Sequence, residues 1–288
     1  MVKLSESWMF PGMISNTNKT YSYVETNDGS ISVYADEYGQ TMHSVSGGYE
    51  EALYKHVIPS GVTTIQKDDI NVLDVGFGLG YNILALLHCC DRGERFSNIR
   101  IISLESDDTI GNLVREIRFN DEKDHVYDKV KAAAQSGEYN DGRIHITILF
   151  GDARHTLKSV KNTRFDTVFH DPFSPASNPE LWSVEFFSLL NERMKPNAVL
   201  TTYSAALQVR MAMMEAGFII GRGPSVGGKK EGTLATIKGS IDALDENEME
   251  GIRSEVRAVP YREKSGLDTR EDLLNRRLEE MRVMKNTG

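Results

Sequence analysis

The segment with the strongest consequence for the fold is residues 165–179, where an apolar stretch ends at Asp171 and three prolines follow within eight residues. The apolar stretch predicts a β-strand. Proline cannot continue a central strand because it has no N–H to donate to the neighbouring strand, so the chain must leave its sheet at Asp171. Open α/β sheets bind ligands just outside the carboxyl ends of their strands. We therefore expect Asp171 to lie at a ligand site, held on a stiff loop.

Predicted strands and helices alternate along the chain from residue 71 onwards. Such alternation favours a mostly parallel sheet with helices on both faces. Seven strands that end in a hairpin with no helix resemble the Rossmann-like sheet of class I methyltransferases. Residues 121–142 are polar and are expected to add a helix and a loop. The strands are predicted at residues 71–75, 99–104, 144–150, 165–170, 198–203, 218–220 and 233–237.

Segments of different character flank this α/β region. Alternating apolar residues around Asp28-Gly29 predict a β-hairpin within residues 20–46, and residues 49–57 are expected to be helical. After residue 240 the chain is charged, and Asp268 with Glu271 predicts a capping box for a late helix. We therefore expect an N-terminal β-hairpin segment (1–60), a central Rossmann-like domain (61–240) and a charged, partly helical extension (241–288).

Composition and net charge narrow the class of protein. A hydrophobic content of 40% over 288 residues suits one large globular domain with appendages. The longest nearly apolar run, residues 83–90, is too short to span a bilayer, and residues 1–21 lack the pattern of a signal peptide, so a cytoplasmic location is expected. Cys89 and Cys90 are adjacent and no cysteine–histidine cluster occurs, so neither a disulfide nor a metal site is expected. The net charge of −9 disfavours a nucleic-acid partner, although a local basic patch can act against it.

A glycine-rich loop follows the first predicted strand of the sheet. Gly76, Gly78 and Gly80 stand immediately before a predicted helix. Glycine turns without strain and lets the backbone approach a ligand, and the N-terminus of a helix offers free N–H groups. The spacing is GxGxG, because Tyr81 stands where the dinucleotide fingerprint GxGxxG needs a glycine. By itself, the loop is compatible with a cofactor site or with a plain tight turn.

Acidic residues follow the next predicted strands in order. Glu105 comes directly after the second strand, where doubly wound sheets bind ribose hydroxyls, and Asp107 or Asp108 could take the same role. Asp152 follows the third strand. An Asp there is often a simple turn residue, but in methyltransferases of this fold it commonly contacts the adenine amino group. A glycine loop and three acids at successive strand ends, the last being Asp171, together favour S-adenosylmethionine over NAD as the cofactor.

Several residues near Asp171 have two interpretations each. Asn178-Pro179 predicts the start of a helix that runs to about residue 194. Trp182 on that helix is either a core residue or a platform for a nucleic-acid base. His170 is expected to pack rather than react, and Tyr203 is a further candidate for the pocket.

Two segments resemble the MnmC-type methyltransferase domain. Residues 76–84 resemble its glycine loop, and residues 171–182 resemble its signature Asp-x-Phe-x-Pro-x-x-Asn-Pro-x-x-Trp. Further similarity covers most of residues 26–282. The resemblance implies methyl transfer that depends on S-adenosylmethionine, with Asp171 as the catalytic residue. It also implies a cofactor site formed by Gly76, Phe77, Gly78, Gly80, Asn82, Glu105, Asp152 and Ala153.

Bacterial members of that family methylate the amine of 5-aminomethyl-2-thiouridine at the wobble position of tRNA. Some carry a fused flavin oxidase, for which 288 residues leave no room, so the resemblance implies the stand-alone form and an upstream enzyme that supplies the aminomethyl uridine. Tyr81, which replaces a smaller residue, and the acidic balance depart from the family's pattern. The implied partner is tRNA, contacted by Phe173, Trp182, Tyr203, Arg222, Lys229 and Lys230.

A spermidine-synthase-like aminopropyltransferase is the alternative, since that family shares the fold, the N-terminal β unit and a strand-end Asp before a proline-rich loop. An acidic protein also suits a polyamine substrate. However, this chain has Phe77 and Leu79 where that family carries an Asp within a longer glycine run, and no second acid follows Asp171 before Glu180. A non-enzymatic cofactor-binding scaffold is a third interpretation, which the carboxylate at position 171 disfavours.

Overall fold

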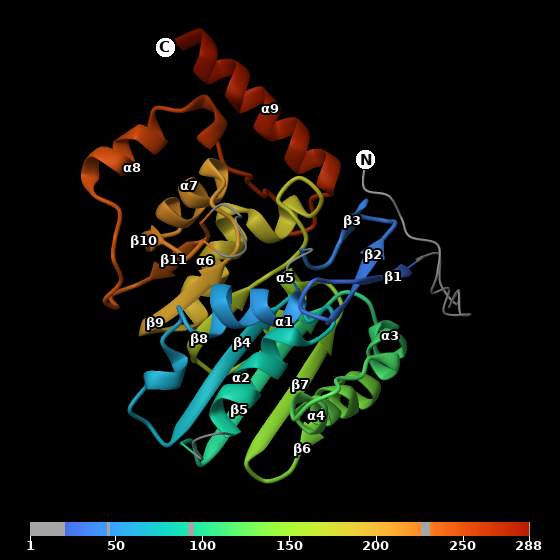
Figure 1. The fold of residues 1–288 in the computed structure, drawn as a ribbon. Coiled ribbons are helices and arrows are strands. Elements are labelled where there is room, and N and C mark those ends of the chain that lie inside the picture. The colour runs from blue at the N-terminus through green and yellow to red at the C-terminus, as the bar shows by residue number, and fades with distance from the viewer. Residues whose placement is uncertain (1–20, 45–46, 92–94, 226–230, 288) are drawn as a thin grey trace.

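One large sheet forms the centre of the molecule (Figure 1). The computed structural model describes residues 21–44, 47–91, 95–225 and 231–287. The sheet contains β4 (Asp69–Val75), β5 (Asn98–Glu105), β6 (Glu138–Asn140), β7 (Ile144–Phe150), β8 (Phe165–His170), β9 (Met194–Thr202), β10 (Ile219–Arg222) and β11 (Thr233–Thr236). Their order is β10-β11-β9-β8-β4-β5-β7-β6. The five strands from β9 to β7 are parallel, and the two edges are antiparallel. This is the class I methyltransferase arrangement predicted from the alternating elements.

The predicted strand number of seven is wrong, because the described part of the sheet has eight strands. The additional strand is β6, which pairs antiparallel with β7 at the sheet edge. It follows α4 (Lys123–Ser136), which ends at Gly137 in the left-handed conformation. Three polar residues are too few to show an alternating pattern, so the sequence predicted a loop there. The pairing depends on β7 rather than on any signal within β6.

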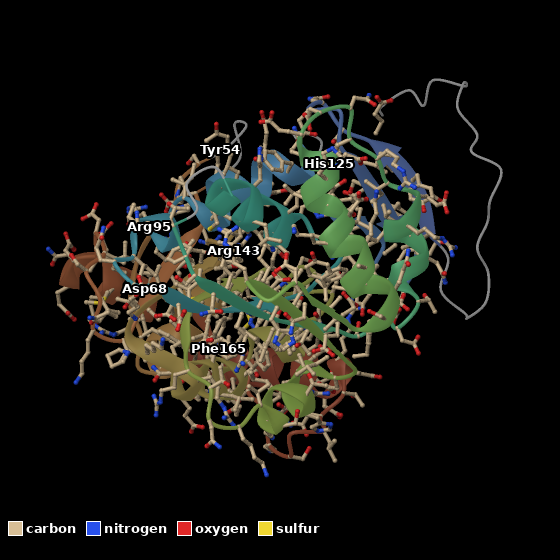
Figure 2. The ribbon with its side chains drawn as sticks, turned by 90° about the horizontal axis from the view of Figure 1, so that it is seen from below. Tyr54, Asp68, Arg95, His125, Arg143 and Phe165 are labelled. Atoms are coloured by element: carbon tan, nitrogen blue, oxygen red, sulfur yellow. The ribbon has the colours of Figure 1, made fainter. Side chains whose placement is uncertain are left out.

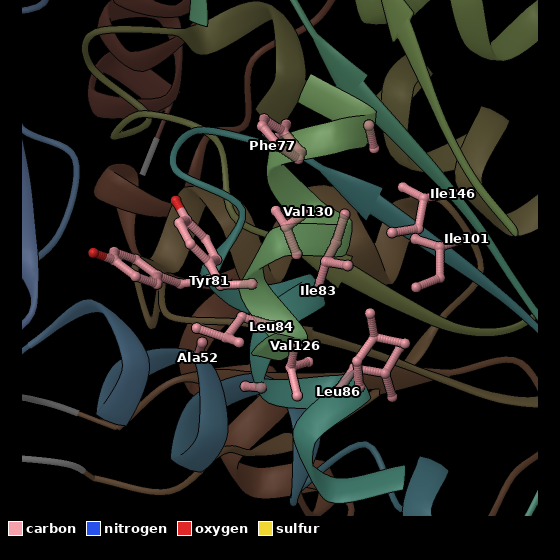
Figure 3. Close-up of a cluster of buried hydrophobic side chains, with 14 of the residues drawn as sticks. Ala52, Phe77, Tyr81, Ile83, Leu84, Leu86, Ile101, Val126, Val130 and Ile146 are labelled. Carbon is pink, nitrogen blue, oxygen red and sulfur yellow. The ribbon is translucent and has the colours of Figure 1, made fainter. Parts of the chain in front are cut away.

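Helices cover both faces of the sheet, as predicted. Side chains alternate between the two faces along a strand. On β4, Ile70 and Val72 join one buried cluster, with α2 (Tyr81–Asp91), α3 (Ile110–Glu116) and α4. Figure 3 shows side chains of this cluster between α2, α4 and the strands. Leu73 and Val75 join the other cluster, which includes residues of α5 (Ala153–Ser159), α6 (Val184–Arg193) and α7 (Leu207–Glu215).

The N-terminal hairpin predicted around Asp28-Gly29 is present as β1 (Tyr21–Glu25) and β2 (Ile31–Ala35), with β3 (Gln40–Thr41) added to make three strands. The helix that follows begins as α1 (Gly48–Glu51) and continues as a π-helix, η1 (Ala52–Val57). A short 3-10 helix, η2 (Val62–Thr64), leads into β4. The N-terminal unit therefore reaches the large sheet through a helix of unusual geometry.

Tyr81, the residue that departs from the family's glycine loop, joins the N-terminal unit to α2. Its hydroxyl donates to the Ile31 carbonyl at 2.6 Å and accepts from the Ile31 N–H at 3.2 Å. The ring is buried, and a Cβ at Gly48 would lie 2.3 Å from it. The larger side chain thus fastens the small sheet to the first helix after the glycine loop.

The helix predicted from Asn178 is interrupted. The structure has a 3-10 helix, η3 (Pro179–Trp182), and then α6, whose cap is Ser183 rather than Asn178. The Ser183 hydroxyl accepts from the Phe186 N–H at 3.1 Å. Ser183 is extended and pairs with Tyr261 in an isolated bridge. That contact with the C-terminal extension separates the two helical pieces, and the sequence pattern around Asn178 carries no sign of it.

The C-terminal extension contains α8 (Glu246–Arg253), η4 (Val256–Ala258) and α9 (Arg270–Thr287). The late helix is present, but its predicted capping pair is displaced by one residue. Thr269 and Asp272 cap it reciprocally, with N–H to side-chain distances of 3.2 and 2.9 Å. Asp268 instead forms an ion pair with Arg276 at 2.7 Å.

The amino ends of the parallel strands are closed by arginines that bind loop carbonyls. Arg95 donates to the carbonyls of Thr64 and Ile65 at 3.0 and 2.7 Å, and Arg143 donates to that of Phe96 at 3.0 Å (Figure 2). This end has a structural role, so the chemistry is expected at the opposite, carboxyl end. Of the helices in the ranges described above, none is long and apolar enough to cross a membrane.

Candidate active site

The carboxyl ends of β4, β5, β7 and β8 surround a cavity of about 470 Å³. Its volume falls within the range of small-molecule sites. The N-terminal unit forms part of the wall through Tyr38, Met42 and His43. Of the residues predicted from the sequence, the cavity is lined by Gly76, Phe77, Gly78, Asn82, Glu105, Asp152, Ala153, Asp171, Phe173 and Tyr203.

The glycine loop lies tightly against the loop that follows β8. Gly76 has φ +91°, and a Cβ there would lie 2.8 Å from the Asp171 carbonyl oxygen. Gly80 does not line the cavity, which disfavours its predicted cofactor contact. A Cβ at Gly80 would lie 2.4 Å from Val130 Cγ1. Gly76 therefore lets two site loops meet, whereas Gly80 lets α2 pack on α4.

Glu105 connects the glycine loop to the end of β5. Its carboxylate accepts the N–H of Gly78 at 3.0 Å and that of Asp107 at 2.8 Å. Burial raises the pKa of Glu105, and these backbone hydrogen bonds lower it only in part. Asp107, an alternative to Glu105 in the sequence, instead accepts from the Tyr21 hydroxyl and from the Thr109 N–H. Glu105 is thus the strand-end acid that holds the glycine loop.

Asp152 begins α5 and serves as its N-cap by accepting the Arg154 N–H at 2.9 Å. The Arg154 guanidinium also binds the carboxylate, at 3.0 and 2.6 Å. Burial would raise the pKa of Asp152, but the hydrogen bonds and charge of Arg154 lower it. Arg154 also pairs with Glu263, so the C-terminal extension is attached directly behind this wall of the cavity.

Asp171 presents its carboxylate to the cavity while two side chains hold it from behind. Asn82 Nδ2 donates to Oδ2 at 3.2 Å, and Nε2 of the buried His56 lies 3.5 Å from Oδ1. Burial alone would raise the pKa of Asp171, but the neighbouring rings of His56 and His43 and the hydrogen bond from Asn82 hold it below its ordinary value. Asp171 is therefore an ionised acceptor at neutral pH.

A second buried acid lies behind Asp171. Asp74 accepts from Ser103 Oγ at 2.6 Å and from Asn82 Nδ2 at 3.2 Å. Burial raises the pKa of Asp74 to about 7, against the lowering effect of these hydrogen bonds. Asn82 thus bridges the two acids and fixes the position of each.

Trp182 supports the loop after Asp171 instead of facing a substrate. Its side chain is fully buried, and Nε1 donates to the Phe173 carbonyl at 2.8 Å. This burial disfavours stacking of a base on Trp182, which packs edgewise on Tyr203 and does not line the cavity. Phe173 does line it and stacks on Tyr38, with ring centroids 3.9 Å apart.

The predicted basic contacts lie away from the cavity or outside the described residues. Arg222 on β10 is exposed and pairs with Glu231 at 2.6 Å and with Glu248. Two carboxylates therefore neutralise its charge, which disfavours Arg222 as a contact for a nucleic-acid backbone. Lys229 and Lys230 belong to the segment that is not described.

Sequence reasoning did not find His56. It is fully buried, and its Nδ1 lies 3.0 Å from Thr201 Oγ1 on β9. Its position next to Asp171 arises from the packing of η1 on β9, which no local pattern encodes. A histidine within a predicted helix, between Lys55 and Val57, was the available signal.

Comparison with known proteins defines the class of the chain. The family model for S-adenosyl-L-methionine-dependent methyltransferases matches residues 118–238. The solved structure of MnmC2 from Aquifex aeolicus has a TM-score of 0.83 and 33% identity, over 91% of this chain and 85% of that one. The protein is an S-adenosylmethionine-dependent methyltransferase. More particularly, it belongs to the MnmC-type methyltransferase family.

Other relatives define the extent of the similarity. An uncharacterized protein of Methanocaldococcus jannaschii is 32% identical over 279 residues, which are 95% of this chain and 76% of that protein. The bifunctional MnmC protein of Azoarcus is 29% identical over 212 residues, and the match spans only 33% of its length. A probable spermidine synthase from Corynebacterium glutamicum shares the fold with a TM-score of 0.51 and 16% identity. That likeness is more distant and concerns the fold alone.

The cavity carries polar groups that suit a ligand as polar as the family's cofactor. Gln40 Nε2 and Glu180 Oε2 are buried atoms with no hydrogen-bond partner among the described residues, and both side chains line the cavity. Buried polar atoms of this kind are rare in proteins unless a ligand or water satisfies them. The site residues therefore fit S-adenosylmethionine.

Proposed function

We propose that this methyltransferase acts on the aminomethyl group of a modified wobble uridine in tRNA. The bifunctional MnmC relatives are named for the biosynthesis of 5-methylaminomethyl-2-thiouridine in tRNA, and this chain spans about a third of their length. The observation that carries the proposal is the Asp171 carboxylate, which faces the cavity and is kept ionised by Asn82 and His56. Such a group suits an acceptor that arrives as an ammonium ion.

An alkyl ammonium ion has a pKa of about 10, like that of lysine, and only the neutral amine is a nucleophile. Asp171 would bind the ammonium through Oδ1 and Oδ2, orient its nitrogen and take a proton from it. When bound, S-adenosylmethionine supplies a methyl group on a positively charged sulfur. The residues proposed to hold the cofactor are Gly76, Phe77, Gly78, Asn82, Glu105, Asp152 and Ala153, all of which line the cavity.

The tRNA contacts belong to the same proposal. Phe173 and Tyr203 line the cavity beside Asp171 and would contact the uridine. Lys229 and Lys230 would bind the tRNA backbone, and an upstream enzyme would supply the aminomethyl uridine in the cytoplasm. Changing both lysines to alanine should lower the slope of log affinity against log salt by about 1.5 for single-stranded phosphates. Arg222→Ala is the matched control and should leave the slope unchanged.

The direct test is to offer labelled S-adenosylmethionine with three acceptors: tRNA that carries aminomethyl uridine, tRNA that lacks it, and putrescine. Label is expected only on the first. Asp171→Asn should reduce that methylation at least about 100-fold. Asp69→Asn, at an exposed position on the opposite end of the sheet, should not. Aminopropyl transfer to putrescine from decarboxylated cofactor, with no label on tRNA, would contradict the proposal and support an aminopropyltransferase.

A further inference from the structure

The π-helix η1 places one histidine directly behind Asp171. π-Helical turns are rare and frequently occur at functional sites. In η1 this turn carries His56, which is fully buried and lies edge-on to Phe169 at 6.0 Å between ring centroids. His56 does not line the cavity, so it reaches the reaction only through another residue.

Both ring nitrogens of His56 face a defined neighbour. Nδ1 lies 3.0 Å from Thr201 Oγ1, and Nε2 lies 3.5 Å from Asp171 Oδ1. A protonated ring nitrogen and a carboxylate usually approach to about 2.7–2.9 Å. The longer separation suits an Nε2 without a proton, with the Nδ1 proton donated to Thr201. His56 is then ready to accept a proton from the direction of Asp171.

Charged and titratable groups surround this pair on several elements. Burial lowers the pKa of His170 on β8 to about 3, so its ring stays neutral. Burial raises the pKa of Tyr203 after β9, so its phenol keeps its proton. Asp74 on β4 is separated from Asp171 by the amide of Asn82. His43 and Glu51 also line the cavity, and His43 also lowers the pKa of Asp171.

We propose that His56 is a positioning residue that receives, through Asp171, the proton lost by the acceptor amine. The inference rests on the proposed function. An N–H bond of the ammonium breaks as an O–H bond forms at Asp171 Oδ1. That O–H bond then breaks as an N–H bond forms at His56 Nε2, which leaves an imidazolium beside a carboxylate. The methylated product carries its own charge as an ammonium, and the stored proton returns through Asp171 to solvent once the product has left.

Storage on His56 explains how a weakly basic carboxylate can activate so basic an amine. The pKa of Asp171 lies below its ordinary value, so Asp171 alone would hold the proton only briefly. Imidazole is a stronger base than a carboxylate. With His56 present, the proton taken by Asp171 can therefore move away from the amine before the methyl group is transferred.

The test is the pH profile of kcat/KM on aminomethyl-uridine tRNA for the wild type, His56→Gln and Thr201→Val. Gln keeps an amide near Nε2 but cannot store a proton. We expect the wild type to be flat from about pH 7 to 9. His56→Gln should be about 100-fold slower at pH 7 and gain about tenfold per pH unit. Thr201→Val should be about tenfold slower, and Thr167→Val, which removes another buried strand hydroxyl, should match the wild type.

Proton release during a single turnover, followed with a pH-indicator dye in weak buffer, gives a second readout. In the wild type, proton release should follow methyl transfer and coincide with product release, and this delay should be lost in His56→Gln. If His56→Gln does not fold, judged by its melting curve and its affinity for S-adenosylhomocysteine, Thr201→Val decides the question. Wild-type pH profiles in the folded variants would overturn the role of His56 and leave the proposed function intact. Absence of methylation by the wild type would instead contradict the proposed function.

Discussion

His170 should make the protein lose stability as the pH falls below 6.5. The ring is fully buried, with Trp182 edge-on at 4.6 Å and Phe187 at 5.1 Å between centroids. Burial lowers the pKa of His170 to about 3, although the charge of Asp171 opposes the shift. An unfolded histidine has a pKa of about 6.5. The unfolded chain therefore binds a proton at pH 5 that the folded chain does not, and the difference favours unfolding.

The size of the effect follows from the two pKa values. Between pH 7.5 and 5.0, an unfolded histidine with a pKa of about 6.5 gains about 2 kcal/mol from protonation, whereas His170 with a pKa of about 3 gains almost nothing. The loss continues as the pH falls and ends near the folded pKa. For a chain of this length, 2 kcal/mol lowers Tm by about 4 °C. No solvent screening reduces this figure, because the ring has no exposed surface.

The assay is the urea unfolding free energy at pH 7.5 and 5.0 for the wild type, His170→Phe and His170→Asn. Both variants lack the titrating ring and differ in volume and polarity. Between pH 7.5 and 5.0, the free energy of unfolding of each variant should fall by about 2 kcal/mol less than that of the wild type. This difference should not depend on the variant's stability at pH 7.5. If both variants lose as much as the wild type, protonation of His170 in the unfolded state is not a source of the acid sensitivity.

Two further predictions concern the loops of the site. Gly80→Ala should lower the free energy of urea unfolding by about 2–4 kcal/mol, because its φ is +73° and its Cβ would lie 2.4 Å from Val130. The control Gly142→Ala, at φ +93° with open space, should lower it by only about 1 kcal/mol. Equal losses in the two variants would refute the clash with Val130. Trp182→Phe removes the hydrogen bond from the indole to the Phe173 carbonyl, so the affinity for the cofactor, measured by calorimetry, should fall about tenfold. Unchanged affinity would show that this hydrogen bond does not hold the loop after Asp171.

The order of the site elements could be predicted from the sequence because each lies at the end of a strand. A parallel sheet brings its carboxyl ends to one edge, so Gly76, Glu105, Asp152 and Asp171 had to meet once the strands were known. Periodicity and proline positions are local signals. They were sufficient to identify these four positions without any knowledge of packing.

The remaining features depend on contacts between distant segments. His56 lies beside Asp171 because η1 packs on β9, and the interruption after Trp182 depends on the bridge from Ser183 to the C-terminal extension. The sequence could not distinguish a core role from a stacking role for Trp182, because the helical pattern around it is the same whether the indole is buried or exposed. Only the packed structure shows its indole under the Phe173 backbone.

The contact between Tyr81 and Gly48 has a consequence for how this family can diverge. The backbone at Gly48 has an ordinary negative φ, so glycine is demanded there by side chains: a Cβ would lie 2.3 Å from the Tyr81 ring and 3.1 Å from His43 Cγ. The two positions form a coupled pair in evolution: a lineage that keeps tyrosine at 81 must keep glycine at 48. A lineage with a small residue at 81 loses the hydroxyl bridge to Ile31 and removes the closer of the two obstacles to a side chain at 48. Aligned relatives should therefore show these two positions changing together, although they lie 33 positions apart in the chain.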